Sequence, residues 1–181
     1  MDRFGIDRPD MRFGLKLKDI SDIAKQSTFK VFTGCVESGG VVKGFCAPAG
    51  EAYSRSDIEK TLAGIVTDFG GKGLAWFKVK MEGGALTLLG GIGKFFTPEL
   101  QQQLVQRFEA KDGDLLLLVA DKEAAANKAL APLRCRVGRD LKLYDPKSFA
   151  FLWVVDFPLL DWNADEKRYD SVHHPFTAPA P

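Results

Sequence analysis

The chain has 181 residues, of which 45% are hydrophobic and 27% are charged. This composition is ordinary for a globular protein and supplies enough apolar surface for a buried core. The 25 basic residues nearly balance the 24 acidic ones, so a net charge of +1 excludes a whole-molecule attraction for nucleic acid or for an anionic membrane.

Neither a membrane span nor a signal peptide is predicted. No apolar run approaches the ~20 residues that cross a bilayer, and the charged N-terminus lacks the apolar stretch of a signal peptide. Cys35, Cys46 and Cys135 are an odd number without C-x-x-C spacing, which is typical of free thiols in a reducing compartment. We therefore expect a cytoplasmic protein without a disulfide framework or a zinc site.

The first predicted elements are a short helix and a β-hairpin. Residues 1–27 are charged and turn-rich, and "LKDISDIAKQS" has the apolar spacing of a short helix. In "TFKVFTGCV", at 28–36, β-branched and aromatic residues alternate, which predicts a strand. "ESGG" predicts a turn and "VVKGFCAP" the returning strand, so we expect a hairpin here.

A helix and a strand follow. In "SRSDIEKTLAGIVTDFGG", Ser56 and Glu59 have the spacing of a capping box, and Gly70 and Gly71 supply a left-handed stop. "LAWFKVKM" predicts a strand, and the glycine-rich "EGGALTLLGGIGKFF" after it predicts a loop.

The next three elements are a helix, a strand and a helix. "TPELQQQLVQRFEA" places Thr97 as the N-cap and Pro98 in the first turn of a helix. "LLLLVAD" is apolar throughout, which predicts a central strand covered on both sides. "KEAAANKALAPLRCRVGRD" predicts a helix that Pro132 kinks and Gly138 ends.

This order of elements favours an α+β fold. We expect a two-layer domain with a mixed or antiparallel sheet and helices on one face. After it, "FAFLWVVDFP" predicts an apolar strand, and "LLDWNADEKRYDSV" predicts a hairpin. Residues 1–27 and 148–181 therefore look like flanks that belong together, with an independent domain at 28–147 inserted between them.

Three motifs deserve a chemical interpretation. "GGIGK" at 90–94 resembles a phosphate loop, but Leu88 and Phe95 stand where that loop needs glycine and Ser or Thr, so a mobile turn is expected. A basic cluster at the end of the last predicted helix comprises Arg134, Arg136, Arg139 and Lys142. It fits a solvated helix end that complements the macrodipole, and alternatively a contact with an RNA backbone.

The only two histidines, His173 and His174, are adjacent. Neighbouring residues of an extended chain point to opposite sides, so the pair is not suited to one metal ion. Two interpretations remain open: ordinary surface or hydrogen-bonded residues, or a pair that holds a polar ligand together with Asp156. No catalytic residue and no metal ligand is assigned.

Two stretches resemble a known family. "RFGIDRPDMRFGLKL" at 3–17 resembles the segment after motif 2 in bacterial-type aspartyl-tRNA synthetases, and "FLWVVDFPLLDW" with "HHPFTAP" resembles the stretch where their catalytic domain resumes. "GGKGLAWFKVK" and "RVGRDLKL" are similar to the GAD domain inserted between them. Arg8, Met11 and Asp161 depart from the usual Lys, Leu and Glu without disturbing the pattern.

The resemblance implies a central fragment of a class II synthetase, with a GAD (DCoH-like) domain flanked by partial catalytic segments. The parent enzyme activates L-aspartate with ATP and Mg²⁺ and transfers it to the 3′ end of tRNA(Asp). His173, with His174 beside it, then contacts L-aspartate. Motifs 1, 2 and 3 are absent, so the fragment alone is expected to be inactive and to bind neither ATP nor Mg²⁺.

The resemblance also implies partners and an alternative. The parent is expected to be a homodimer that acts on tRNA, with neither DNA nor membrane as a partner. The alternative is a stand-alone GAD module that binds tRNA or a protein partner, as in the B subunit of the tRNA-dependent amidotransferase. The flanks argue against it, because a free GAD domain has no use for "DFPLLDW" or "HHPF".

Overall fold

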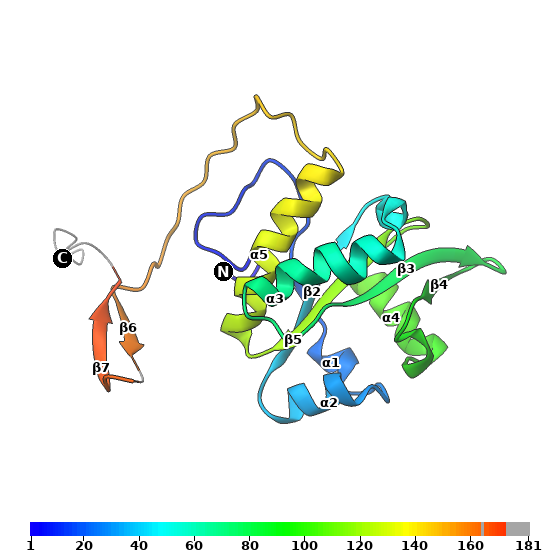
Figure 1. Cartoon of the computed structure of the whole chain (residues 1–181), viewed down its shortest axis with the longest axis horizontal. Coiled ribbons are helices and arrows are strands. Elements are labelled where there is room, and N and C mark those ends of the chain that lie inside the picture. The colour runs from blue at the N-terminus through cyan, green and yellow to red at the C-terminus, as the bar shows by residue number, and fades with distance from the viewer. Residues whose placement is uncertain (164, 173–181) are drawn as a thin grey trace. The chain divides into compact units, whose positions relative to one another are not determined.

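A computed structural model describes residues 1–163 and 165–172 of the chain. It divides into two compact units, Met1–Ala150 and Phe151–Pro181, which are treated separately below (Figure 1). None of the helices in this described part combines the length and the apolar character that crossing a membrane requires.

The first unit is built on a five-stranded antiparallel sheet. Its strand order is β1-β2-β5-β3-β4, so β5 is central, as its apolar sequence predicts (Figure 1). The strands are β1 (Lys18–Asp19), β2 (Val41–Ala47), β3 (Ala75–Glu82), β4 (Ala85–Leu89) and β5 (Leu115–Asp121). The predicted α+β class with an antiparallel sheet is confirmed.

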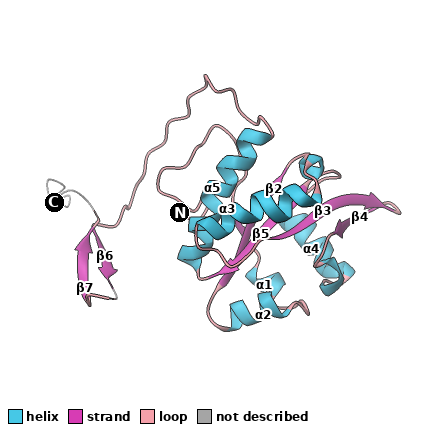
Figure 2. Ribbon diagram, viewed as in Figure 1, coloured by secondary structure: helices cyan, strands magenta, loops and turns pink. Residues whose placement is uncertain are grey.

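Helices cover both faces of this sheet, so the expectation of helices on one face is wrong (Figure 2). The helices are α1 (Ser21–Ala24), α2 (Lys30–Glu37), α3 (Ala63–Asp68), α4 (Pro98–Phe108) and α5 (Glu123–Asp140). Leu115, Leu117 and Val119 pack towards α3 and α5, whereas Leu116 and Leu118 pack towards α1, α2 and α4. Because side chains alternate along a strand, a β5 that is apolar from Leu115 to Ala120 needs an apolar cover on each face.

The segment predicted as the first strand of a hairpin is helix α2 instead. Phe29 and Phe32 lie three residues apart and pack into the same core cluster, while Val31 between them is 60% exposed. Three-residue spacing of the buried side chains is helical, and two aromatic residues and two valines over nine positions mimic strand alternation. The turn at 37–40 and strand β2 are present as expected.

The glycine-rich stretch predicted as a loop contains strand β4. It pairs with β3 from Lys78↔Leu89 to Glu82↔Ala85. Gly83 and Gly84 connect the two strands with φ angles of 57° and 85°, the positive values that a tight hairpin turn requires. The Gly-Gly pair between two apolar runs was the signal for this hairpin.

The predicted N-cap of α4 is confirmed, whereas the capping box before α3 is formed by other residues than predicted. The Thr97 side chain accepts a hydrogen bond from the Leu100 N–H at the start of α4, as predicted. The capping box near α3 lies two residues upstream of the predicted one: the Asp57 N–H donates to Ser54 Oγ, and the Ser54 N–H donates to Asp57 Oδ2. A π-helical stretch, Asp57–Leu62, leads into α3.

Helix α5 continues past Gly138, so the prediction that this glycine ends the helix is wrong. Pro132 lies within the helix, as the sequence predicts. Gly138 is buried because the ring of Phe13 lies against it: a Cβ atom there would be 2.7 Å from the ring. This glycine therefore serves close packing rather than helix termination.

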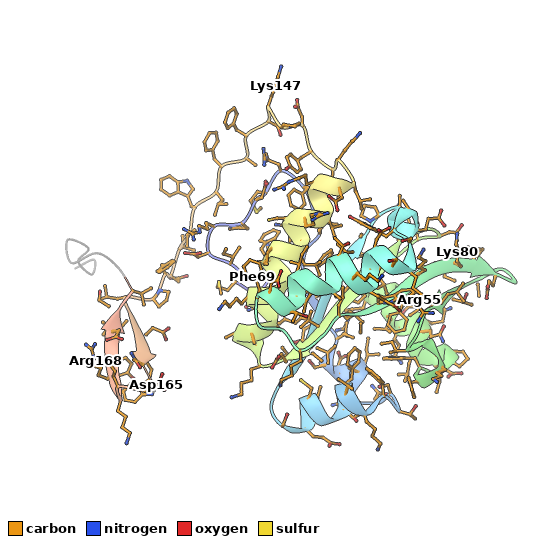
Figure 3. The ribbon with its side chains drawn as sticks, in the orientation of Figure 1. Arg55, Phe69, Lys80, Lys147, Asp165 and Arg168 are labelled. Carbon is orange, nitrogen blue, oxygen red and sulfur yellow. The ribbon has the colours of Figure 1, made fainter. Side chains whose placement is uncertain are left out.

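The second unit contains the predicted hairpin, β6 (Leu160–Asn163) and β7 (Arg168–Ser171). The rings of Trp162 and Tyr169 pack edge to face across it with centroids 5.1 Å apart. Arg168, labelled on this hairpin in Figure 3, forms ion pairs with Glu166 and Asp170. Residues 149–158 have no strand pairing, so the strand predicted there is wrong for this structure. A strand needs a partner that supplies hydrogen bonds.

Candidate functional site

Arg134 of α5 is buried and binds the backbone of a single segment. Its side chain is 1% exposed. Its Nε donates to the carbonyl of Leu15 at 3.0 Å, and its Nη2 lies 2.7, 3.0 and 2.9 Å from the carbonyls of Asp10, Phe13 and Gly14. One guanidinium thus fixes the fold of a stretch about 120 residues away in sequence.

Two aromatic rings complete this arrangement, which we call the Arg134 clamp: Arg134, Phe4, Phe13 and the carbonyls it binds. The guanidinium carbon lies 4.5 Å from the ring centroid of Phe4 and 4.3 Å from that of Phe13. Burial lowers the pKa of Arg134. Ring faces and carbonyl dipoles stabilise the cation in place of a carboxylate.

The clamp extends to Tyr144, in the segment after α5. The ring of Phe13 stacks on that of Tyr144 with centroids 5.4 Å apart, and the Arg12 guanidinium lies 4.1 Å from the same Tyr144 ring. Arg12 also pairs with Asp10 at 2.7 Å, and this hydrogen bond holds the pKa of the Asp10 carboxyl below its usual value. The segment from Asp10 to Phe13 is therefore held by Arg134 and by Tyr144.

The sequence contains a signal for the clamp that the predictions missed. The tripeptide Arg-Phe-Gly occurs twice, at 3–5 and 12–14, and its two phenylalanines are the two rings on Arg134. Gly5 has a φ of +72°, and a Cβ atom there would lie 2.8 Å from the carbonyl oxygen of Asn127 on α5. Each repeat therefore contributes a ring, and the glycine of the first repeat also allows a close approach to the backbone of α5.

The predicted basic cluster is divided by the fold. Arg134 does not lie at a solvated helix end, and that expectation is wrong because its donors are used inside the clamp. Arg136 pairs with Asp140 one helical turn away, at 2.8 Å. Arg139 and Lys142 are exposed. His173 and His174 lie outside the described residues.

Neither a phosphate loop nor a metal centre is present among the residues that the structure describes. In "GGIGK" the N–H groups of Gly93 and Phe95 donate to the carbonyls of Gly90 and Ile92, so they do not point at a ligand. No group of three or more His, Cys, Asp or Glu in 1–163 and 165–172 is placed to hold a metal ion.

The three cysteines are free thiols. Burial raises the pKa of Cys35, Cys46 and Cys135. A raised thiol pKa disfavours the nucleophilic thiolate. These cysteines are therefore suited to packing rather than to covalent catalysis.

The fold of the sheet and its helices belongs to a known class of domain. Residues 32–130 match the family model described as "GAD domain". This range begins within α2 and ends within α5, so it includes strands β2 to β5. The chain belongs to the GAD domain family.

Its relatives are bacterial aspartate–tRNA ligases. The chain is 50% identical over 179 residues to the aspartate–tRNA(Asp/Asn) ligase of Moorella thermoacetica, which covers 99% of the chain and 29% of that protein. It is 50% identical over 180 residues to the aspartate–tRNA ligase of Bacillus licheniformis, and 47% over 180 residues to that of Listeria monocytogenes, covering 99% of the chain and 30% of either protein. The chain therefore spans about 30% of the length of these relatives and is homologous to a part of them.

Proposed function

We propose that this chain acts as part of a longer aspartate–tRNA ligase, which joins L-aspartate to tRNA(Asp) at the expense of ATP. The observation that carries the proposal is the 50% identity to such ligases over 99% of the chain. Identity at this level extends beyond the GAD match at 32–130 into both flanks, which favours a ligase over a stand-alone GAD module.

In this proposal residues 1–27 and 148–181 are catalytic-domain segments around a GAD domain at 28–147. Exposed apolar side chains support the assignment of the second flank. Trp153 is 93% exposed and Val155 is 74% exposed. Large apolar side chains in a contiguous run normally mark an interaction site. We assign the segment around them to a sheet that other parts of the longer protein complete.

The site residues of the ligase reaction are proposed by family resemblance. His173 contacts L-aspartate, and His174 lies beside it in the amino-acid pocket. ATP and Mg²⁺ belong to the longer protein. The described residues do not provide a carboxylate cluster for Mg²⁺, so no step of the reaction is assigned to them.

The contribution of the described residues is positional. Aminoacylation depends on holding reactants in a productive geometry, and small displacements of a supporting segment lower the rate. The Arg134 clamp fixes the segment 3–17, next to motif 2 by resemblance, onto α5 of the GAD domain. The GAD domain is therefore a rigid support for that segment.

The test is aminoacylation by the longer protein. We expect aspartate- and tRNA-dependent activity, and none from the 181-residue chain alone. In the longer protein His173→Ala should raise the KM for aspartate, while Lys60→Ala on the exposed surface should leave it unchanged. Activity of the isolated chain, or an unchanged KM in the His173 variant, would contradict the respective assignment.

Further features of the longer enzyme are proposed from the resemblance: a homodimer in the cytoplasm, without DNA or membrane as a partner. Exposed Arg139 and Lys142, together with Arg136, supply a basic surface for an RNA backbone. Neutralising Arg139 and Lys142 together should weaken tRNA binding and lower its salt dependence. An unchanged salt dependence would exclude this surface.

A further inference from the structure

A pocket of about 620 Å³ opens on the face of the sheet that α2 partly covers. Its floor includes Ala75 of β3 with Leu118 and Ala120 of β5, and α2 forms one wall. Pockets of roughly 300–1,000 Å³ are the size that accommodates small molecules or single chemical groups. The clamp residues do not line this pocket, so it is separate from the site described above.

Small residues keep the pocket open. Gly34 lies in the middle of α2, where glycine costs helix stability. A Cβ atom at Gly34 would have no heavy atom within 4 Å, so no close packing requires a glycine there. The half-buried ring of Phe29 contributes apolar lining beside it, whereas Phe32 is 1% exposed and belongs to the core behind it. The wall thus offers an apolar surface with space in front of it.

Charge at the mouth of the pocket is positive. Asp121 is 5% exposed; its Oδ1 accepts a hydrogen bond from the Lys122 N–H at 2.8 Å and forms an ion pair with Lys72 Nζ at 3.1 Å. The ammonium groups of Lys72 and Lys122 belong to exposed residues. These three are the charged residues of the lining, so the solvent-facing charge is that of two lysines against one buried carboxylate.

We propose that this pocket receives an unstacked nucleobase of an RNA strand, with Lys72 and Lys122 at the adjoining phosphates. Proteins bind single-stranded RNA by placing bases against aromatic side chains beside a positively charged path for the backbone. An apolar pocket with the half-buried ring of Phe29 in its wall, and with lysines at its mouth, offers both parts. The inference rests on the proposed function, in which the RNA that the protein binds is tRNA.

Filling the pocket is the direct test. Gly34→Leu places a large side chain into the open space, and leucine in place of glycine favours the helix, so the variant should fold. The matched control is Gly64→Leu in α3, where a Cβ atom also meets nothing within 4 Å and which does not line the pocket. Both variants are compared with the unchanged 181-residue chain by thermal unfolding and by binding of a six-nucleotide single-stranded RNA.

We expect Gly34→Leu to weaken RNA binding by about 5- to 150-fold, the loss that corresponds to one stacked base, and Gly64→Leu to leave it within about twofold. Lys122→Ala should weaken binding and lower its salt dependence, whereas Lys60→Ala should do neither. Equal binding by the two leucine variants would overturn the proposal. Binding of polyglutamate in place of RNA would overturn it too, because the pocket would then serve an acidic peptide.

A second measurement separates this inference from the proposed function. In the longer ligase, Gly34→Leu should raise the KM for tRNA while the KM for aspartate stays constant. An active ligase with an unchanged KM for tRNA would remove the pocket proposal and leave the ligase proposal intact. If the longer protein binds RNA in a way that depends on Gly34 but has no ligase activity, the pocket proposal stands and the ligase proposal fails.

Discussion

The guanidinium carbon of Arg134 lies 4.3 Å from the ring centroid of Phe13, whose own backbone carbonyl accepts a 3.0 Å hydrogen bond from Arg134 Nη2. Side chain and main chain of Phe13 therefore bind the same cation. The conformation of "DMRFGL" is consequently tied to α5 by a charged group that has no carboxylate partner among the hydrogen bonds it makes. Removing this group leaves carbonyls buried without a donor.

Replacing Arg134 should be costly. Arg134→Met preserves much of the side-chain volume but removes every donor to the four carbonyls, which should lower the free energy of unfolding by about 3 kcal/mol or more. Arg134→Lys should recover little, because an ammonium cannot reproduce the planar fork of donors. Urea denaturation of the chain measures both losses.

The control for this series is Arg139→Met, five residues along the same helix and exposed. Its effect should stay within about 0.5 kcal/mol, as for most surface substitutions. Equal losses at the two positions would show that the clamp contributes nothing beyond the general effect of removing a charge from α5.

Two glycines in helices should respond in opposite directions to alanine. At Gly138 a Cβ atom would lie 2.7–2.9 Å from three ring atoms of Phe13, so Gly138→Ala should destabilise the chain by about 1–3 kcal/mol through overpacking. At Gly64 nothing lies within 4 Å, so Gly64→Ala should stabilise by about 0.4–1 kcal/mol. Melting temperatures of both variants provide the measurement, and a gain at Gly138 would refute the close contact with Phe13.

The elements that sequence alone predicts are those with local signals. Thr97 with Pro98 marks the start of α4 because capping is a local hydrogen bond. The central position of β5 follows from its run of six apolar residues, Leu115–Ala120, since a strand covered on both faces favours apolar side chains on each. Local chemistry decides these features without reference to distant residues.

The elements that sequence alone misplaces depend on distant partners. The alternation of residues 28–36 predicts a strand, but the structure has helix α2 there because Phe32 packs among residues of the strands and of other helices. The local sequence predicts Arg134 at the surface. It is buried because Phe4 and Phe13, which are distant in sequence, pack against its guanidinium. Helix α2 forms one wall of the pocket, so the pocket could not be predicted from a sequence analysis that places a strand at 28–36.

A substitution in the exposed segment after Ala150 should have different effects in the 181-residue chain and in the longer ligase. In the 181-residue chain Trp153 is 93% exposed, so Trp153→Ser should change the free energy of unfolding by about 0.5 kcal/mol or less. In the longer ligase, where we propose that the same segment joins a sheet, the substitution should cost about 3–5 kcal/mol, as for a buried large side chain. Differential scanning calorimetry on both proteins provides the comparison, and equal effects would argue against burial in the longer protein.

The Asp10–Arg12 pair predicts how stability depends on pH. The hydrogen bond from Arg12 lowers the pKa of the Asp10 carboxyl from its ordinary value of 3.8. A carboxyl whose pKa is lower in the folded state contributes stability above its unfolded pKa, and that contribution is lost as the pH falls through the folded pKa. Asp10→Asn should therefore lower the free energy of unfolding at pH 7, and the difference from the unchanged chain should shrink once the pH falls below about 3.8. Asp165→Asn on the exposed hairpin turn is the control, and it should change the free energy of unfolding at pH 7 by about 0.5 kcal/mol or less. Urea titrations at a series of pH values measure the two differences, and a difference for Asp10→Asn that grows at low pH would reverse the sign and exclude the pair as its source.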